Sequence, residues 1–155
     1  MSSKKNKEQG MTLIAKSISS LMVGVIMMFG VYIAFYGHLT PGGGFAGGVI
    51  IAASWILLML THSKKVSLKK FPDLATSLLD NFGALSFVVV GLLGFLGGGF
   101  FVNFVQKGEP FGLLSAGTVL LSNISIMIKV MAGLLAIFVG LSIFGRMVSE
   151  SDKGE

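Results

Sequence analysis

The sequence predicts an all-α integral membrane protein with four transmembrane helices and with both termini in the cytoplasm. Of its 155 residues, 53% are hydrophobic and only 12% are charged, whereas soluble domains carry about 25% charged residues. The apolar residues gather in runs of the length that a bilayer-spanning helix needs, about 20 residues. The lysines gather in the two tails and in one loop between the runs, which is typical of cytoplasmic segments.

The first apolar run follows a polar tail, which we place at residues 1–17. Basic residues before an apolar stretch also occur in signal peptides. This run is longer than the roughly 7–15 residues of a signal-peptide core, and no Ala-x-Ala site follows it. We therefore interpret it as a retained transmembrane helix at about residues 18–36.

A glycine-rich turn ends the first span. Pro41 lacks a backbone donor and restrains Thr40, and the successive glycines that follow have a high entropic cost in a helix. No helix is therefore expected to pass through this segment unbroken. It suits either a tight turn between two helices, or a place where backbone approaches a neighbouring chain or presents N–H groups to an anion. Its members are Pro41, Gly42, Gly43, Gly44, Gly47 and Gly48.

Small residues predict close helix packing in the second and third spans, which we place at about 44–61 and 82–105. In the second span they recur at every fourth position, and the third span contains a GxxxG pair. Such residues let helix backbones approach each other closely in lipid. The residues concerned are Gly44, Gly48 and Ala52 in the second span and Gly91, Gly94 and Gly98 in the third.

The last apolar segment, residues 111–145, is too long for one upright span. As one helix it would measure about 52 Å, against about 30 Å for the hydrocarbon core. Either the helix is strongly tilted, or residues 111–122 form a separate short element before a span at about 123–145. We favour the second arrangement. A polar tail, residues 146–155, follows, so that residues 18–145 form a single four-helix transmembrane domain.

The basic residues predict the orientation of the chain. With four spans, both tails and the middle loop lie on one side of the membrane. Ten of the twelve Lys and Arg residues lie in these segments, one lies on the opposite side at Lys107, and Lys129 lies within a span. This bias places both termini in the cytoplasm and the glycine-rich turn on the outer side.

Lys129 is the strongest functional candidate, because a lysine at the centre of a membrane helix costs about 2.5–3.5 kcal/mol on insertion scales. It should face a polar cavity or a carboxylate partner, or else extend its amine to the interface. Hydroxyl residues lead to it at helical spacing and would form one stripe on a continuous helix, either a hydrated path or a packing seam. They are Ser115, Thr118, Ser122 and Ser125; Asn123 lies beside the stripe.

Two further titratable residues are candidates. His38, at a membrane edge, either relays protons or binds an ion, or else forms a hydrogen bond with the local backbone. Asp80 is expected where the third helix begins, at the positive end of the helix dipole. No acid falls inside a predicted span, and a carrier of cations usually needs one, so we expect that this chain does not transport ions alone.

Several functional classes are not expected. The chain has no cysteine, which excludes thiolate metal sites and iron–sulfur ligation by this chain. It has no phosphate-binding loop ending in Lys-Ser/Thr, no His cluster and no serine nucleophile with a plausible base. We therefore expect a non-catalytic chain without a bound cofactor or metal, and no nucleic-acid partner.

A family resemblance rests on the segment GHLTPGGGFAGGVI, residues 37–50, and on the looser block SAGTV, residues 115–119. These resemble the B subunit of Mrp-type multisubunit Na+/H+ antiporters and the homologous subunit of membrane-bound hydrogenases and sulfane reductases, over about residues 20–145. The resemblance implies a multi-pass subunit in the cell membrane of a bacterium or archaeon. Its partners would be other antiporter subunits, hydrogenase-type redox subunits in one variant, and lipid, and the complex would transport Na+ and H+.

The resemblance carries Lys129, His38 and the glycine-rich turn over as part of a subunit interface or a shared ion path. The family pattern often has an acid near position 123 and lacks a lysine at position 129, and this sequence departs from it at both. We therefore lean towards the redox-coupled variant. A purely structural subunit and a small self-contained homo-oligomeric transporter are the alternatives. From the residues and the resemblance together, we assign seven residues to an ion path or a subunit interface: Lys129, His38, Ser125, Ser122, Thr118, Asn123 and Asp80.

Overall fold

The computed structural model describes residues 12–61, 73–105, 108–109, 111–113 and 115–151. Over these ranges the chain is helical and contains no strand. Its four long helices are each long and apolar enough to cross a membrane, which confirms the predicted fold class. They are α1 (Leu13–Phe35), α2 (Gly43–Thr61), α4 (Asp73–Leu93) and α5 (Thr118–Ser151), and a short 3-10 helix, η1 (Gly94–Gly97), follows α4.

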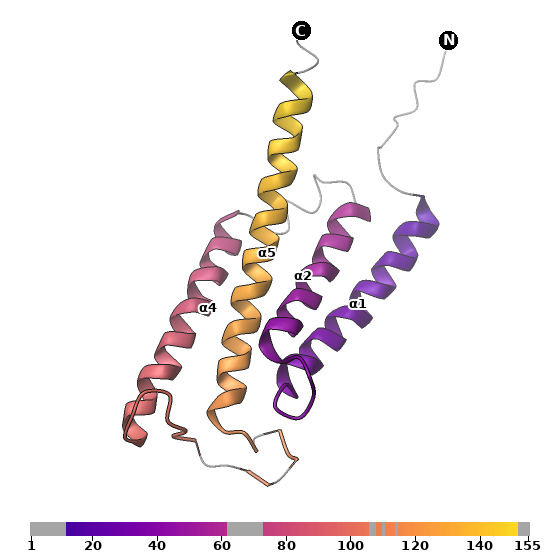
Figure 1. Cartoon of the computed structure of the whole chain (residues 1–155). Helices are drawn as coiled ribbons and strands as arrows, with labels where there is room; N and C mark the ends of the chain where they lie inside the picture. Colours follow the sequence, from indigo (N-terminus) through magenta and orange to yellow (C-terminus); the bar gives the residue numbers. More distant parts are fainter. Residues whose placement is uncertain (1–11, 62–72, 106–107, 110, 114, 152–155) are drawn as a thin grey trace, which may run out of the picture.

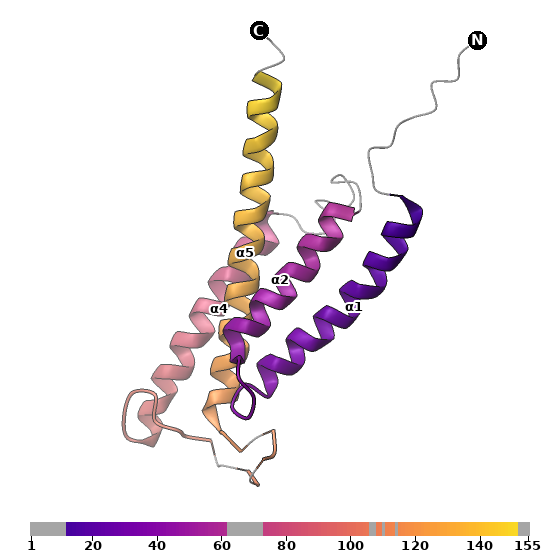
Figure 2. The same ribbon diagram turned by 45° about the vertical axis from the view of Figure 1, so that its right-hand side comes forward.

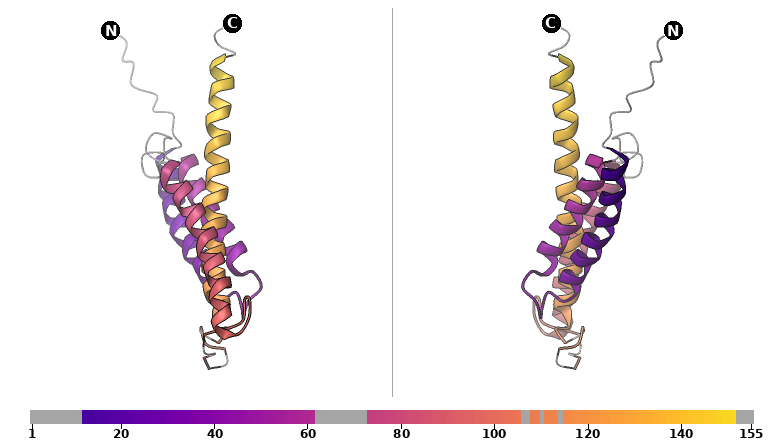
Figure 3. Two further views of the ribbon diagram at one scale, coloured as in Figure 1. Left: turned by 90° about the vertical axis from the view of Figure 1, so that its left-hand side faces the viewer. Right: turned by 90° about the vertical axis from the view of Figure 1, so that its right-hand side faces the viewer.

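The four long helices pack side by side in one bundle. Helix α2 packs against α1 and α5, and α4 packs on α5. The two views in Figures 1 and 2 agree on this order. Helix α5 runs past the ends of the other three, as Figure 3 shows from both sides. The start of α1 and the end of α5 lie at the same end of the bundle (Figure 1), as an even number of spans requires.

The core lies between α2 and α5. It contains Ala52 and Met59 of α2 and Leu135 and Val139 of α5, with Trp55 packed beside them. Many large apolar side chains on the outer faces are exposed, such as Leu13 at 82%. In a membrane protein such faces contact lipid or neighbouring subunits.

The first helix begins earlier than expected. It starts at Leu13 rather than near residue 18, so Lys16 lies inside α1. The Thr12 side chain accepts a hydrogen bond from the Ala15 amide at 3.3 Å and caps the helix. This is the usual role of threonine at a helix N-terminus.

The third helix lies about nine residues before the span expected at 82–105. It begins at Asp73, and after η1 the chain reverses at Gly98, whose φ is +103°. The Phe101 amide then donates to the Gly91 carbonyl at 3.1 Å, so the following residues fold back over the helix end. Gly94 and Gly98 therefore do not form the expected helical packing face. Apolar composition alone does not distinguish a helix from such a folded-back segment, and left-handed glycine commonly ends a helix.

The last helix is continuous from Thr118 to Ser151, so residues 118–122 belong to it, and the described residues among 111–117 form no separate helix. Residues 111–113 and 115–117 form turns instead. Gly117 adopts a φ of +58°, and the Asn103 side-chain oxygen accepts from the Thr118 amide at 3.1 Å. A remote asparagine thus caps the helix and fixes where it begins.

Candidate functional site

The glycine-rich turn packs directly on α5. Gly42 and Gly43 have φ values of +143° and +75°, which glycine adopts without strain, and they turn the chain into α2. A side chain at Gly44 would collide with the backbone of Asn123, and the Asn123 amide also borders Gly43. Gly48 similarly faces the Met127 carbonyl on α5. The turn is therefore a close helix contact.

Gly47 faces the opposite way, towards α1. A Cβ there would lie 2.6 Å from the Gly30 carbonyl oxygen and 2.8 Å from the Ala34 side chain. Alternating glycines thus let α2 approach α1 on one side and α5 on the other. Pro41 and Gly42 are exposed at the tip of the turn.

His38 connects the glycine-rich turn to the segment before α5. Its Nε2 lies 3.2 Å from the Gly112 carbonyl oxygen, so this nitrogen carries the proton and donates. Its Nδ1 is buried and has no hydrogen-bond partner among the described residues. His38 thus bonds backbone 74 residues away, rather than the backbone of its own turn.

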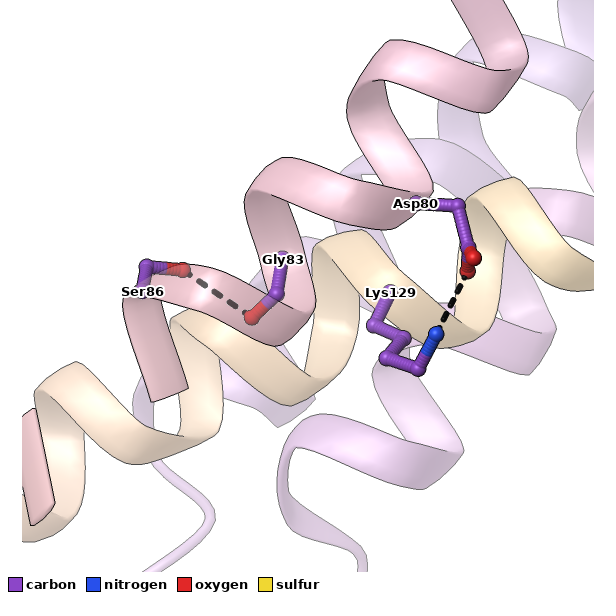
Figure 4. A network of polar contacts seen from close by, with 4 residues as sticks. All are labelled: Asp80, Gly83, Ser86 and Lys129. Carbon is purple, nitrogen blue, oxygen red and sulfur yellow. Dashed lines mark hydrogen bonds and ion pairs between the residues drawn. The ribbon is translucent and has the colours of Figure 1, made fainter. Parts of the chain in front are cut away.

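The central polar feature is an ion pair between α4 and α5. Figure 4 shows Lys129 Nζ donating to Asp80 Oδ1, at 2.9 Å. Their side chains are 48% and 34% exposed. The carboxylate partner that Lys129 requires therefore lies within this chain.

The position of Asp80 corrects two expectations. Since α4 begins at Asp73, Asp80 lies about two turns inside the helix and not at its positive end. It also lies inside the candidate membrane span Leu74–Gly97, so one acid does occur within a span. The first turns of α4 contain polar residues, so the sequence did not indicate that the helix begins before Asp80.

Close backbone contact between α4 and α5 adjoins the ion pair. A Cβ at Gly83 would lie 2.7 Å from the Lys129 backbone nitrogen and 2.9 Å from its Cα. One turn further, Ser86 Oγ donates to the Gly83 carbonyl at 3.0 Å (Figure 4). Glycine at position 83 brings Lys129 within reach of Asp80.

A groove of about 390 Å³ adjoins the pair between the two helices. Polar side chains of α4 line one wall, and mostly small residues of α5 line the other. We call this the α4–α5 groove. Its lining residues are Thr76, Ser77 and Asp80 of α4 and Gly133, Ala136, Val139, Gly140 and Ile143 of α5.

The hydroxyl stripe on α5 behaves as a packing seam. Ser122 Oγ donates to the Thr118 carbonyl at 3.2 Å, and Ser125 Oγ donates to the Leu121 carbonyl at 3.0 Å. Thr118 and Ser125 are buried. Ser115 lies in a turn and is not part of the helix. The serine protons are therefore bonded within α5, and the helical part of the stripe does not continue to residue 115.

Sequence reasoning missed Gly83, Asn103 and the two hydroxyl residues of the groove. The spacing of Thr76, Ser77 and Asp80 is the signal that could have revealed the groove, because i, i+3 and i+4 positions share one helical face. No group of three metal-ligating side chains occurs among the residues that the structure describes.

Known proteins resemble this chain over most of its length. A family model described as a domain related to the MnhB subunit of Na+/H+ antiporter matches residues 14–136. A putative antiporter subunit of Staphylococcus epidermidis is 29% identical, over 84% of this chain and 94% of its own length. The corresponding subunit of Staphylococcus aureus is 26% identical over the same shares.

Two archaeal matches are longer than this chain. An uncharacterized protein of Methanocaldococcus jannaschii is 31% identical over 93% of this chain, but the match spans only 57% of that protein. A chain of the membrane-bound sulfane sulfur reductase, an archaeal respiratory membrane complex, matches with a TM-score of 0.69 and 28% identity. That match covers 89% of this chain and 62% of the other. Because the family model covers most of its length, the chain belongs to the MnhB-related family of Na+/H+ antiporter subunits.

Proposed function

We propose that this chain is a non-catalytic membrane subunit of a multisubunit Mrp-type cation/proton antiport module. The observation that carries the proposal is the Asp80–Lys129 pair, which lies inside the spans and borders a groove. Charged residues inside a membrane are costly and usually mark an ion pathway. In this reading the pair is the polar group that the chain contributes to ion movement through the complex.

The arrangement favours a shared path over independent transport. The carboxylate is paired with the lysine in this structure, and the serine hydroxyls of α5 are bonded to their own helix. The exposed apolar faces of the helices leave room for neighbouring subunits. Na+ and H+ would be the ions that the complex moves, and both chain termini would lie in the cytoplasm.

A redox-coupled complex is the variant that we favour. The likeness to a chain of the membrane-bound sulfane sulfur reductase, an archaeal respiratory membrane complex, supports this choice. In that variant, redox subunits would join the antiporter subunits as partners. A stand-alone antiporter would contain the antiporter subunits alone.

The composition of the complex tests this proposal. The chain would carry a tag at its C-terminus and be purified in mild detergent, and every co-purifying chain would be identified by mass spectrometry. Antiporter subunits together with redox subunits are the expected result. Antiporter subunits alone would indicate the stand-alone antiporter, and recovery as a homo-oligomer would overturn both variants.

A purely structural subunit is the second candidate. The packing seam and the close glycine contacts of α2 favour it, because these features serve assembly without moving ions. Lys129→Met separates the two candidates. If the complex assembles and Na+/H+ exchange in vesicles is lost, the pair takes part in transport. Unchanged exchange would favour the structural role.

A further inference from the structure

We propose that the α4–α5 groove is a water-filled inlet that brings a monovalent cation, Na+ or H+, to Asp80 from one side of the membrane only. The cation would compete with Lys129 for the carboxylate. This inference rests on the proposed function and adds to it an entry route, a side and a class of ligand.

The groove is one-sided because its lining residues other than Asp80 itself all lie on one side of the ion pair. On α4, Thr76 and Ser77 precede Asp80, and on α5 the lining residues follow Lys129. The two helices are antiparallel (Figure 1), so both sets lead to the same end of the bundle, where α4 begins. In the other direction the backbone contact at Gly83 brings the helices together.

The charged groups at the inner end of the groove require water. An ammonium has three donors and a carboxylate has two acceptor oxygens, and the single bond between them uses only one of each. Both side chains remain partly exposed, and lipid tails offer no hydrogen bonds. Asp80 lies only seven residues from the start of α4, about 10 Å along the helix. Water therefore has a short route to the pair.

Small residues keep this route open. A Cβ added at Gly140 would meet no atom within 4 Å, and one added at Gly133 would lie 3.6 Å from Asp80 Oδ1. Ala136, between them, is exposed. Larger side chains at these positions would fill the space beside the carboxylate.

The α4 wall of the groove offers oxygen atoms to a cation. Thr76 and Ser77 lie about one turn before Asp80 and line the same groove. Hydroxyl and carboxylate oxygens are the ligands that hard cations prefer. A cation at Asp80 and the ammonium of Lys129 repel each other, so the carboxylate holds one of them at a time. A proton on Asp80 would release Lys129 in the same way.

Cysteine accessibility tests the inlet, because the natural chain contains no cysteine. Ala136→Cys and Gly140→Cys would be labelled with a membrane-impermeant thiol reagent in oriented vesicles from cells that make the whole complex. The matched controls are Ile137→Cys and Leu141→Cys, at positions on the outer face of α5 that are 61% and 67% exposed. The chain would be captured by its tag, and the fraction labelled would be measured by mass spectrometry.

We expect the two groove cysteines to react at least about tenfold faster than the two controls, because a thiol in lipid does not ionise. They should react from the side that carries the chain termini and not from the other. Equal slow rates would mean that lipid or a partner helix fills the groove, and would overturn the inlet. Antiport measured in the same vesicles tests the proposed function separately, since an unreactive groove with intact antiport overturns only the inlet.

The cation is identified by titrating Na+ at constant pH, and pH at constant Na+. The labelling rate of Ala136→Cys would be divided by that of Gly145→Cys, at the C-terminal end of the span Thr118–Gly145, which corrects for the ionisation of the thiol. A saturable response to Na+ that disappears in Asp80→Asn identifies Na+. A response to pH alone that disappears in the same variant identifies H+. If neither titration changes the ratio, cation binding at Asp80 is refuted.

Discussion

Gly83→Ala is the sharpest test of the contact that holds α4 on α5. The added methyl carbon would lie 2.7 Å from the Lys129 nitrogen and 2.9 Å from its Cα, whereas ordinary contact begins at 3.4 Å. The two nearest atoms are backbone and the third is the Lys129 Cβ, so none of them is the end of a flexible side chain. The helices must therefore separate by about 0.7 Å, and such overpacking costs about 1–3 kcal/mol.

The matched control is Gly24→Ala in the middle of α1, where an added Cβ meets no atom within 4 Å. Both variants gain the same helix propensity, roughly 0.5–1 kcal/mol, when glycine is replaced. The difference in unfolding free energy between them therefore isolates the packing cost. At about 2–4 °C per kcal/mol for a chain of this size, Gly83→Ala should melt roughly 2–12 °C below Gly24→Ala.

The chain supplies its own probe for this measurement. Trp55 is its single tryptophan and packs beside the core between α2 and α5. Its fluorescence would follow thermal unfolding of the purified full-length chain in detergent. If Gly83→Ala melts at or above the temperature of Gly24→Ala, α4 and α5 do not touch at this position and the reasoning is refuted.

Three further predictions concern a cap, a packed glycine and the ion pair. Asn103→Ala removes the acceptor for the Thr118 amide, which should cost about 1 kcal/mol and speed hydrogen exchange at the start of α5; unchanged exchange would exclude the cap. Gly44→Ala places a methyl group against the Asn123 backbone and should cost about 1–3 kcal/mol by the same fluorescence assay, whereas full stability would disprove the contact. Lys129→Met leaves Asp80 unpaired and should cost about 1–2 kcal/mol, since the pair is partly exposed. Adding Asp80→Asn should recover most of that loss, and a double variant no more stable than the single one would contradict the pair.

The number of helices and the break between α1 and α2 could be predicted from sequence. Apolar runs of sufficient length determine the spans, and the residues around Pro41 cannot continue a helix. The spacing of Gly44, Gly48 and Ala52 likewise predicted a small-residue face, and the structure places Gly44 and Gly48 against α5. These features depend on local composition and periodicity, which a single sequence contains.

The ion pair could not be predicted, because it depends on how α4 and α5 are aligned. Asp80 and Lys129 are 49 residues apart, and no local pattern connects them. The start of α4 was missed for a related reason. Its first turns are polar on the side that lines the groove, so they resembled a loop, and Asp80 was placed at a helix end.

The end of α4 was missed because glycine has two roles. Gly94 and Gly98 have the spacing of a helix-packing motif, but Gly98 adopts a left-handed conformation and reverses the chain. Nothing in the sequence distinguishes these two uses of the same residues. The asparagine cap at position 103 was hidden likewise, since its partner lies 15 residues further on.

The length of α5 has a mechanical consequence. The helix is unbroken from Lys129 to Ser151, a distance of 22 residues or about 33 Å. A tilt of about 5° at the level of Lys129 would therefore displace the last turn by about 3 Å. Since the end of α5 extends past the other helices (Figure 3), a small change of tilt at the level of Lys129 would become a larger movement outside the bundle.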